Sequence, residues 1–217
     1  MTMPNAEFRK FHEFTKMEDG DGDLPTIWGM ATWEHPDSDN ERCDYETAKP
    51  VYEAWSSKAF KRTKNAGQEI SLGNIRLQHG SEVGGKATKL HFDDAAKEVW
   101  LGSEPIDETV HSALKKGHYT GYSQGGSYAW RACDTCETPL PLQQGNNFCP
   151  ECDKYVVVRY GLKRIAEVSY VDSPATGEGF EHVKRNGSRE ILKFAKKQEV
   201  PPVAKETKKV RDEEAVK

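Results

Sequence analysis

The sequence predicts a β-rich α+β fold, built as a small closed or nearly closed β-barrel with flanking helices. Two observations carry this prediction: the 217-residue chain holds many short apolar segments with the alternation of strands, and few segments with helical spacing. A doubly wound sheet needs more helices, so a barrel fits the pattern better. A third observation, two Cys-x-x-Cys sequences, indicates a small metal-binding insert.

The individual elements follow from local patterns. The segment 107–117 is the clearest helix, because Asp107 can cap its start, Val110 and Leu114 share a face, and Gly117 can end it. The expected elements are, in chain order, a strand at 24–33, a helix at 49–64, strands at 75–79, 86–92 and 98–102, the helix at 107–117, and strands at 119–130, 155–160 and 165–171.

Composition divides the chain into unequal parts. Residues 1–22 are predicted to be a polar lead-in with little periodicity, and residues 23–187 to be the folded domain. The segment 131–154 interrupts this domain as the cysteine-containing insert. Residues 188–217 are highly charged, which predicts a disordered tail, with a short helix as a candidate at 188–197 and disorder at 199–217.

The charge balance restricts the class of partner. The formal net charge is −4, from 31 basic and 35 acidic residues, whereas a general nucleic-acid binder carries a basic footprint. No run is long and apolar enough for a membrane span, and the first 16 residues lack the apolar core of a secretory signal. We therefore expect an intracellular protein that binds neither membranes nor nucleic acid.

Four of the five cysteines are arranged as metal ligands. Two thiolates in a Cys-x-x-Cys hairpin can bind one ion, and a second such hairpin completes a tetrahedral site. Because four thiolates fill the coordination sphere, the expected cofactor is a structural zinc, and none is expected for catalysis. The predicted ligands are Cys133, Cys136, Cys149 and Cys152. The fifth, Cys43, has no predicted role.

A glycine-flanked serine and an upstream histidine indicate acyl transfer. A serine hydroxyl needs a base within hydrogen-bond reach, and histidine is the usual base. Ser123 lies in Gly-Tyr-Ser-Gln-Gly-Gly, and His79 follows a short predicted strand. Two other interpretations remain open: Ser123 as a turn serine, or as the nucleophile of an esterase-like hydrolase with Asp172 and His182.

Three motifs in order resemble the phage prohead maturation serine proteases, and most closely their XkdF-like branch. The motifs are Asn-Ile-Arg-Leu-Gln-His-Gly at 74–80, Gly-His-Tyr-Thr-Gly-Tyr-Ser-Gln-Gly-Gly at 117–126 and Ala-Glu-Val-Ser-Tyr-Val-Asp-Ser-Pro-Ala at 166–175. The resemblance covers roughly residues 24–185. It implies a small barrel with flanking helices, similar to the herpesvirus assembly proteases. The cysteine insert is not part of the typical family pattern.

The resemblance also implies roles for individual residues. Ser123 would be the nucleophile and His79 the general base. Glu167 is the first choice for the acid that orients the histidine, and Asp172 is the alternative. Backbone N–H groups near the serine would hold the oxyanion, with Gly125 and Gly126 as candidates.

The implied function is cleavage of the scaffold and the major capsid protein, and of the enzyme itself, during phage head maturation. The partners would be those proteins, with the portal as a further candidate, and a homo-oligomer is expected. The place of action would be the assembling procapsid in the bacterial cytoplasm. The alternative is a catalytically inactive relative that acts as a zinc-containing head-assembly or scaffold module.

Overall fold

The structure, a computed structural model, describes residues 7–19, 24–172 and 180–192. Twelve strands and two helices occur in these ranges. In chain order they are β1 (Glu7–Glu18), β2 (Thr26–Trp33), β3 (Glu41–Cys43), α1 (Tyr45–Asn65), β4 (Gly73–Leu77), β5 (Val83–Asp93), β6 (Glu98–Pro105), α2 (Glu108–Lys115), β7 (Gly121–Cys133), β8 (Phe148–Cys149), β9 (Lys154–Tyr155), β10 (Val158–Val171), β11 (Phe180–Val183) and β12 (Arg189–Leu192).

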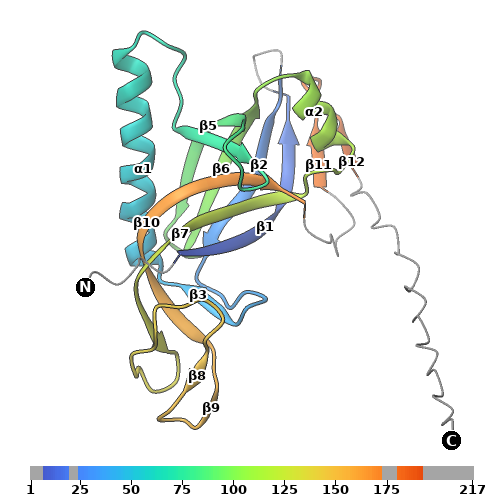
Figure 1. Cartoon of the computed structure of the whole chain (residues 1–217). Helices are drawn as coiled ribbons and strands as arrows, with labels where there is room; N and C mark the ends of the chain where they lie inside the picture. Colours follow the sequence, from blue (N-terminus) through green and yellow to red (C-terminus); the bar gives the residue numbers. More distant parts are fainter. Residues whose placement is uncertain (1–6, 20–23, 173–179, 193–217) are drawn as a thin grey trace, which may run out of the picture.

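Seven strands close into a barrel, as the sequence predicts. The order around the ring is β1-β2-β6-β5-β4-β10-β7, and β7 returns to pair with β1. Strand β3 extends the sheet beside β10, and the hairpin of β11 and β12 attaches to β1. Figure 1 shows α1 alongside the barrel, with the cysteine-containing loop projecting from one end and α2 near the other.

The first strand corrects the predicted lead-in. Residues 7–18, expected to be part of a polar lead-in, form β1, which completes the barrel between β2 and β7. Phe8, Phe14 and Met17 point into the core from this strand. The predicted tail begins too early and the short helix considered at 188–197 is wrong where the chain is described, because residues 189–192 form β12, paired with β11. The remainder of that prediction, residues 193–217, lies outside the described residues.

Each helix begins after an aspartate that acts as its N-cap. Asp44 accepts a hydrogen bond from Thr47 N at 2.9 Å and so starts α1 four residues before the predicted boundary. Asp107 accepts one from Val110 N at 2.9 Å and starts α2, as its sequence pattern predicts. Neither helix in the described ranges is long and apolar enough to cross a bilayer.

The barrel interior contains polar hydroxyl groups as well as apolar side chains. Ser103 Oγ lies within hydrogen-bond distance of the hydroxyls of Tyr122 and Tyr170, and Tyr122 also donates to the Ile27 carbonyl at 2.8 Å. Burial raises the pKa of both tyrosines, so both remain neutral donors. These bonds join β7 and β10 to β6 from inside the barrel.

Strands β7 and β10 form one long antiparallel hairpin. Their register runs from Cys133 opposite Val158 to Gly121 opposite Val171, with three irregularities along the way. The cysteine-containing segment is the connection that joins the two strands at the closed end of this hairpin. The two strands that carry Ser123 and Glu167 are therefore neighbours, and the insert lies at the far end of both.

Candidate active site and metal centre

The predicted nucleophile lies on the outward face of the barrel wall. Tyr122 and Gln124 point inward, where Gln124 accepts a hydrogen bond from the buried Tyr52 hydroxyl. Because side chains alternate along a strand, Ser123 points to the opposite face. Its side chain is nevertheless buried, with an exposed fraction of 3%.

The predicted base sits in a turn with an uncommon backbone. Gln78 and His79 have φ values of 47° and 59°, both in the left-handed region that non-glycine residues rarely adopt. The turn is closed by Gly80 N donating to the Leu77 carbonyl at 2.7 Å, and Gln78 N donates to the Tyr170 carbonyl on β10. Positive φ at both central residues is typical of a tight turn between antiparallel strands, here β4 and β5, and it places His79 at the tip of their connection.

The predicted acid contacts this histidine directly. His79 Nδ1 lies 2.6 Å from Glu167 Oε1, and both side chains are largely buried. An ionised carboxylate can only accept, so Nδ1 carries the proton of this bond. In the neutral ring Nε2 is then left with a free lone pair, which is the arrangement a general base requires.

The strand register places the serine next to this pair. Ser123 lies opposite Ser169 on β10, and Gly125 lies opposite Glu167. Opposite residues share a face, so Ser123, Ser169 and Glu167 all face outward together. Within the described residues no hydrogen bond joins Ser123 Oγ to the His79 ring. Such bonds are often longer in enzymes without substrate than in the reacting complex.

The residues of the esterase alternative are not brought together. His182 lies on β11 opposite Met17, while Ser123 is opposite Phe11 of the same strand β1. Six residues of strand separate these positions by about 20 Å. His182 Nε2 contacts Asp19 at 2.9 Å, whereas Asp172 is exposed just beyond the end of β10.

The two oxyanion candidates lie in the middle of β7. Gly125 and Gly126 are flanked on both sides, by β1 and by β10, where backbone N–H groups normally serve the sheet ladder. A register irregularity lies beside them, because Ile165 and Glu167 oppose these two successive glycines with Ala166 as an extra residue. At Gly125 a Cβ atom would collide with Glu167 Oε1, so glycine leaves the space that the carboxylate occupies.

A cavity of about 590 Å³ opens on the same outward face. Its wall includes a cross-strand row of Asn74, Lys86 and Glu104 on β4, β5 and β6. Asn74 precedes Ile75, which lies opposite Val168, so this row continues beside Glu167. The described residues that line the cavity do not include Ser123, His79 or Glu167.

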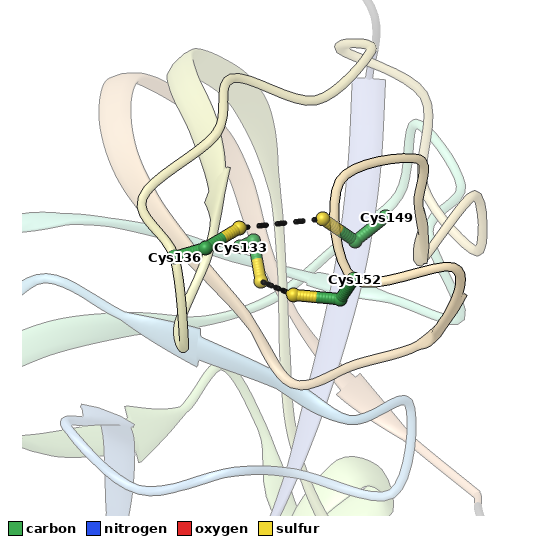
Figure 2. Close-up of side chains that lie close together, drawn as sticks. All are labelled: Cys133, Cys136, Cys149 and Cys152. Carbon is green, nitrogen blue, oxygen red and sulfur yellow. Dashed lines mark hydrogen bonds between the residues drawn. The ribbon is translucent and has the colours of Figure 1, made fainter.

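The four predicted metal ligands converge at the tip of the long hairpin (Figure 2). All four sulfur atoms lie within 4.8 Å of one another, with Cys133–Cys152 at 3.8 Å and Cys136–Cys149 at 3.5 Å. Tetrahedral zinc with Zn–S bonds of about 2.3 Å separates its sulfurs by about 3.8 Å, whereas a disulfide needs about 2.05 Å. The donor set thus fits a metal such as zinc, and the thiols are not disulfide-bonded.

The thiols differ in acidity. Hydrogen bonds with Thr138 lower the pKa of Cys136 to about 6, so this ligand is a thiolate at neutral pH. Burial raises the pKa of Cys149, and the hydrogen bond with Cys136 raises that of Cys152 to about 12. Metal binding would therefore release protons from the remaining thiols.

A buried cluster of charged side chains connects the cysteine-containing loop to the barrel. Arg131 Nη2 donates to Glu41 and to Asn147 Oδ1. Arg131 Nη1 donates to the backbone carbonyls of Pro141 and Asn146. The side chains of Arg131 and Glu41 are 0% exposed. The loop between the two cysteine pairs is thus fixed to the barrel wall by charge-assisted hydrogen bonds.

Lys10 of β1 is the second cation of this cluster. Its ammonium lies 2.8 Å from both Asp37 and Glu41, and Tyr128 donates to the same Glu41 carboxylate at 2.8 Å. Burial alone would lower the pKa of Lys10, but Glu41 and Asp37 outweigh it, so the pKa is raised and the side chain stays charged.

Sequence reasoning did not identify Ser169 or this ionic cluster. Ser169 lies in the same motif as Glu167, and its hydroxyl donates to Glu167 Oε2. A serine two residues beyond a candidate acid on a strand shares its face, and this spacing is the signal that was available. The cluster had no local signal, because Lys10, Glu41 and Arg131 are far apart in the chain.

Comparison with known proteins bears on the fold. No family model matches the chain, and no curated protein matches it. Among solved structures, the chain is similar to the capsid assembly protease gp21 of bacteriophage T4, with a TM-score of 0.51 and 6% sequence identity. The match covers 77% of this chain and 98% of that one. This chain therefore has a fold similar to that of a phage capsid assembly protease.

Proposed function

We propose that this protein is a serine endopeptidase of phage head maturation. The single observation that carries the proposal is the contact between His79 Nδ1 and Glu167 Oε1, next to Ser123, in a fold similar to a phage capsid assembly protease. Histidine, acid and serine come from three separate strands or turns, and each stood in a motif of the prohead protease resemblance.

In the proposed mechanism His79 Nε2 takes the proton of Ser123 as Oγ attacks the scissile carbonyl. Glu167 holds the imidazole through Nδ1–H and stabilises the imidazolium that forms. The same imidazolium then protonates the leaving amine, and water releases the acyl group in a second cycle. The His79–Glu167 contact favours Glu167 over the exposed Asp172 as the acid.

The oxyanion of this reaction would be held by backbone N–H groups. Gly125 and Gly126 remain the candidates, and the extra residue Ala166 in β10 supports them. An extra residue on one strand leaves the ladder locally disrupted, which can free a donor on its partner. The removal of one such donor typically costs 10²–10³-fold in kcat.

The proposed substrates are the scaffold and major capsid proteins, and the chain itself, inside the assembling procapsid in the bacterial cytoplasm. The portal and further copies of this chain are proposed partners. The cavity lined by Asn74, Lys86 and Glu104 is the proposed site for a side chain of the bound polypeptide. Membership in the XkdF-like branch is part of this proposal and rests on the three sequence motifs.

The four-cysteine site is proposed to be a structural zinc ribbon. When bound, zinc would hold the tip of the β7–β10 hairpin together and take no part in catalysis, because four thiolates leave no open position. The residues that would hold it are Cys133, Cys136, Cys149 and Cys152.

The alternative function is a catalytically inactive zinc-containing assembly module. The buried position of Ser123 and the lack of a hydrogen bond between it and His79 in the described structure favour this alternative. The contact between His79 and Glu167 favours the enzyme, because a module that needed only its shape would have no use for an oriented imidazole.

The decisive experiment is co-expression of the full chain with the capsid and scaffold proteins encoded beside it, read by intact mass. Specific truncations with the wild type and none with Ser123→Ala support the protease. Ser127→Ala is the matched control, since Ser127 is another buried serine of the same face of β7, and it should cleave normally. His79→Gln should abolish cleavage and His182→Gln should not.

The opposite outcomes are equally informative. Truncations that persist in Ser123→Ala would refute the nucleophile. Full-length products from the wild type, even after the portal and remaining head proteins are added, would establish the inactive module.

A further inference from the structure

Both oxygens of the Glu167 carboxylate have a partner. Oε1 receives the His79 Nδ1–H at 2.6 Å, and Oε2 receives the hydroxyl of Ser169. Ser169 is 0% exposed and lies on β10 between Ser123 of β7 and Arg76 of β4 in the strand register. A hydroxyl has one proton, and that of Ser169 is committed to Glu167.

We propose that Ser169 is a positioning residue that holds Glu167 against His79, so that His79, Glu167 and Ser169 form a hydrogen-bonded series beside Ser123. The inference rests on the proposed function for its catalytic consequence, but the hydrogen-bonded series itself does not depend on that function. Ser169 acts only through Glu167 and touches no reacting atom.

The physical need for this residue comes from the flexibility of glutamate. A glutamate side chain has three rotatable torsions and loses up to about 2 kcal/mol of rotamer entropy when it is fixed. Asp in the usual triad is shorter and more easily held. A second hydrogen bond on the far oxygen selects the rotamer that presents Oε1 to Nδ1, and a bond to a charged acceptor is among the stronger ones.

The surroundings of Glu167 leave this task to Ser169. On the other side of the carboxylate lies Gly125, which has no side chain and supplies only space. Charged side chains at outward positions around the pair are Arg9 on β1, Arg76 on β4, Lys86 on β5 and Glu82 in the turn. In the described residues none of them hydrogen bonds to Glu167 or to the His79 ring.

The test uses the full chain with Ser123→Ala as the parent, which prevents self-cleavage, and with ¹⁵N-labelled histidine. The His79 Nδ1–H proton is observed by NMR and is assigned by its absence in His79→Gln. A carboxylate-bonded Nδ1–H proton should give a low-field signal in the parent. Ser169→Ala should lose this signal or move it upfield, and Ser169→Thr, which keeps the hydroxyl, should retain it.

Ser127→Ala is the matched control, because Ser127 Oγ is buried on the same face of β7 without a hydrogen-bond partner. It should leave the signal unchanged. In the enzyme with Ser123 intact, Ser169→Ala should lower kcat at least tenfold at an unchanged KM, with thermal unfolding close to that of the wild type.

Different outcomes refute the role of Ser169 and the proposed protease function. An unchanged Nδ1–H signal or an unchanged kcat in Ser169→Ala overturns the role of Ser169, and so does the absence of the low-field signal in the parent. A wild-type protein that cleaves no head protein refutes the proposed function, and the NMR comparison still decides whether Ser169 positions Glu167.

Discussion

Glu41→Gln is expected to destabilise the protein more than any surface substitution. Glu41 is 0% exposed and is shared by three donors: Lys10, Arg131 and Tyr128. The substitution keeps the size of the side chain and removes its charge. Lys10 retains Asp37 at 2.8 Å, but Arg131 loses the only carboxylate that contacts it in the described part of the chain, while its side chain remains 0% exposed.

The magnitude follows from that uncompensated charge. Removal of one partner of a buried ion pair costs about 3–5 kcal/mol. With a urea dependence of about 2 kcal/mol/M, a loss of 4 kcal/mol lowers the unfolding midpoint by about 2 M. Since whole domains are stable by about 5–15 kcal/mol, the variant should still fold at low temperature.

The assay is urea unfolding of Glu41→Gln beside Glu46→Gln. Glu46 makes an equally short ion pair, 2.6 Å to Lys97, but is 73% exposed on the first turn of α1. The exposed pair should cost less than about 1 kcal/mol, and less still at high salt. Equal midpoints for the two variants would show that the buried cluster does not anchor the cysteine-containing loop. They would also show that the Glu41 charge contributes no more to stability than the exposed Glu46 charge.

Two further outcomes are expected. Gly125→Ala should reduce proteolysis at least tenfold with little loss of stability, because the added Cβ displaces Glu167 Oε1 from His79; activity equal to wild type would contradict the packing of the carboxylate on the glycine. The purified chain should contain close to one zinc per molecule by elemental analysis, and Cys149→Ser should lose it and unfold at lower temperature; a folded, metal-free wild type would reject the zinc ribbon.

The barrel class was predictable because most of its strands are apolar on one face, and that alternation survives in the sequence. Strand β1 was missed because one of its inward positions is Lys10, so the segment reads as polar. The charge of Lys10 is balanced by Asp37 and Glu41, and no local sequence pattern indicates partners so far away in the chain. A pattern of alternating polarity fails wherever a buried charge is compensated from elsewhere in the chain.

Some residues of the candidate site could likewise be predicted from local sequence, and others needed the three-dimensional pairing of strands. Ser123 and His79 could be proposed from short motifs, because glycine-flanked turns and strands leave a local signature. The choice between Glu167 and Asp172 needed the pairing of β4 with β10, which sets the histidine turn beside one acid and not the other. The four thiols were predictable, since their spacing alone encodes two hairpins facing one ion.

Because β1 pairs with β7, the barrel of this chain can close only late in synthesis. Phe11 lies opposite Ser123, more than a hundred positions later in the chain, and Glu167 and Ser169 follow later still. Contacts this distant in sequence form slowly and only after the intervening chain exists. During synthesis β7 has β1 available as a partner, but it lacks its second neighbour until β10 leaves the ribosome. A half-made chain therefore has no assembled candidate site, because Glu167 and Ser169 join Ser123 only when synthesis of the barrel is nearly finished.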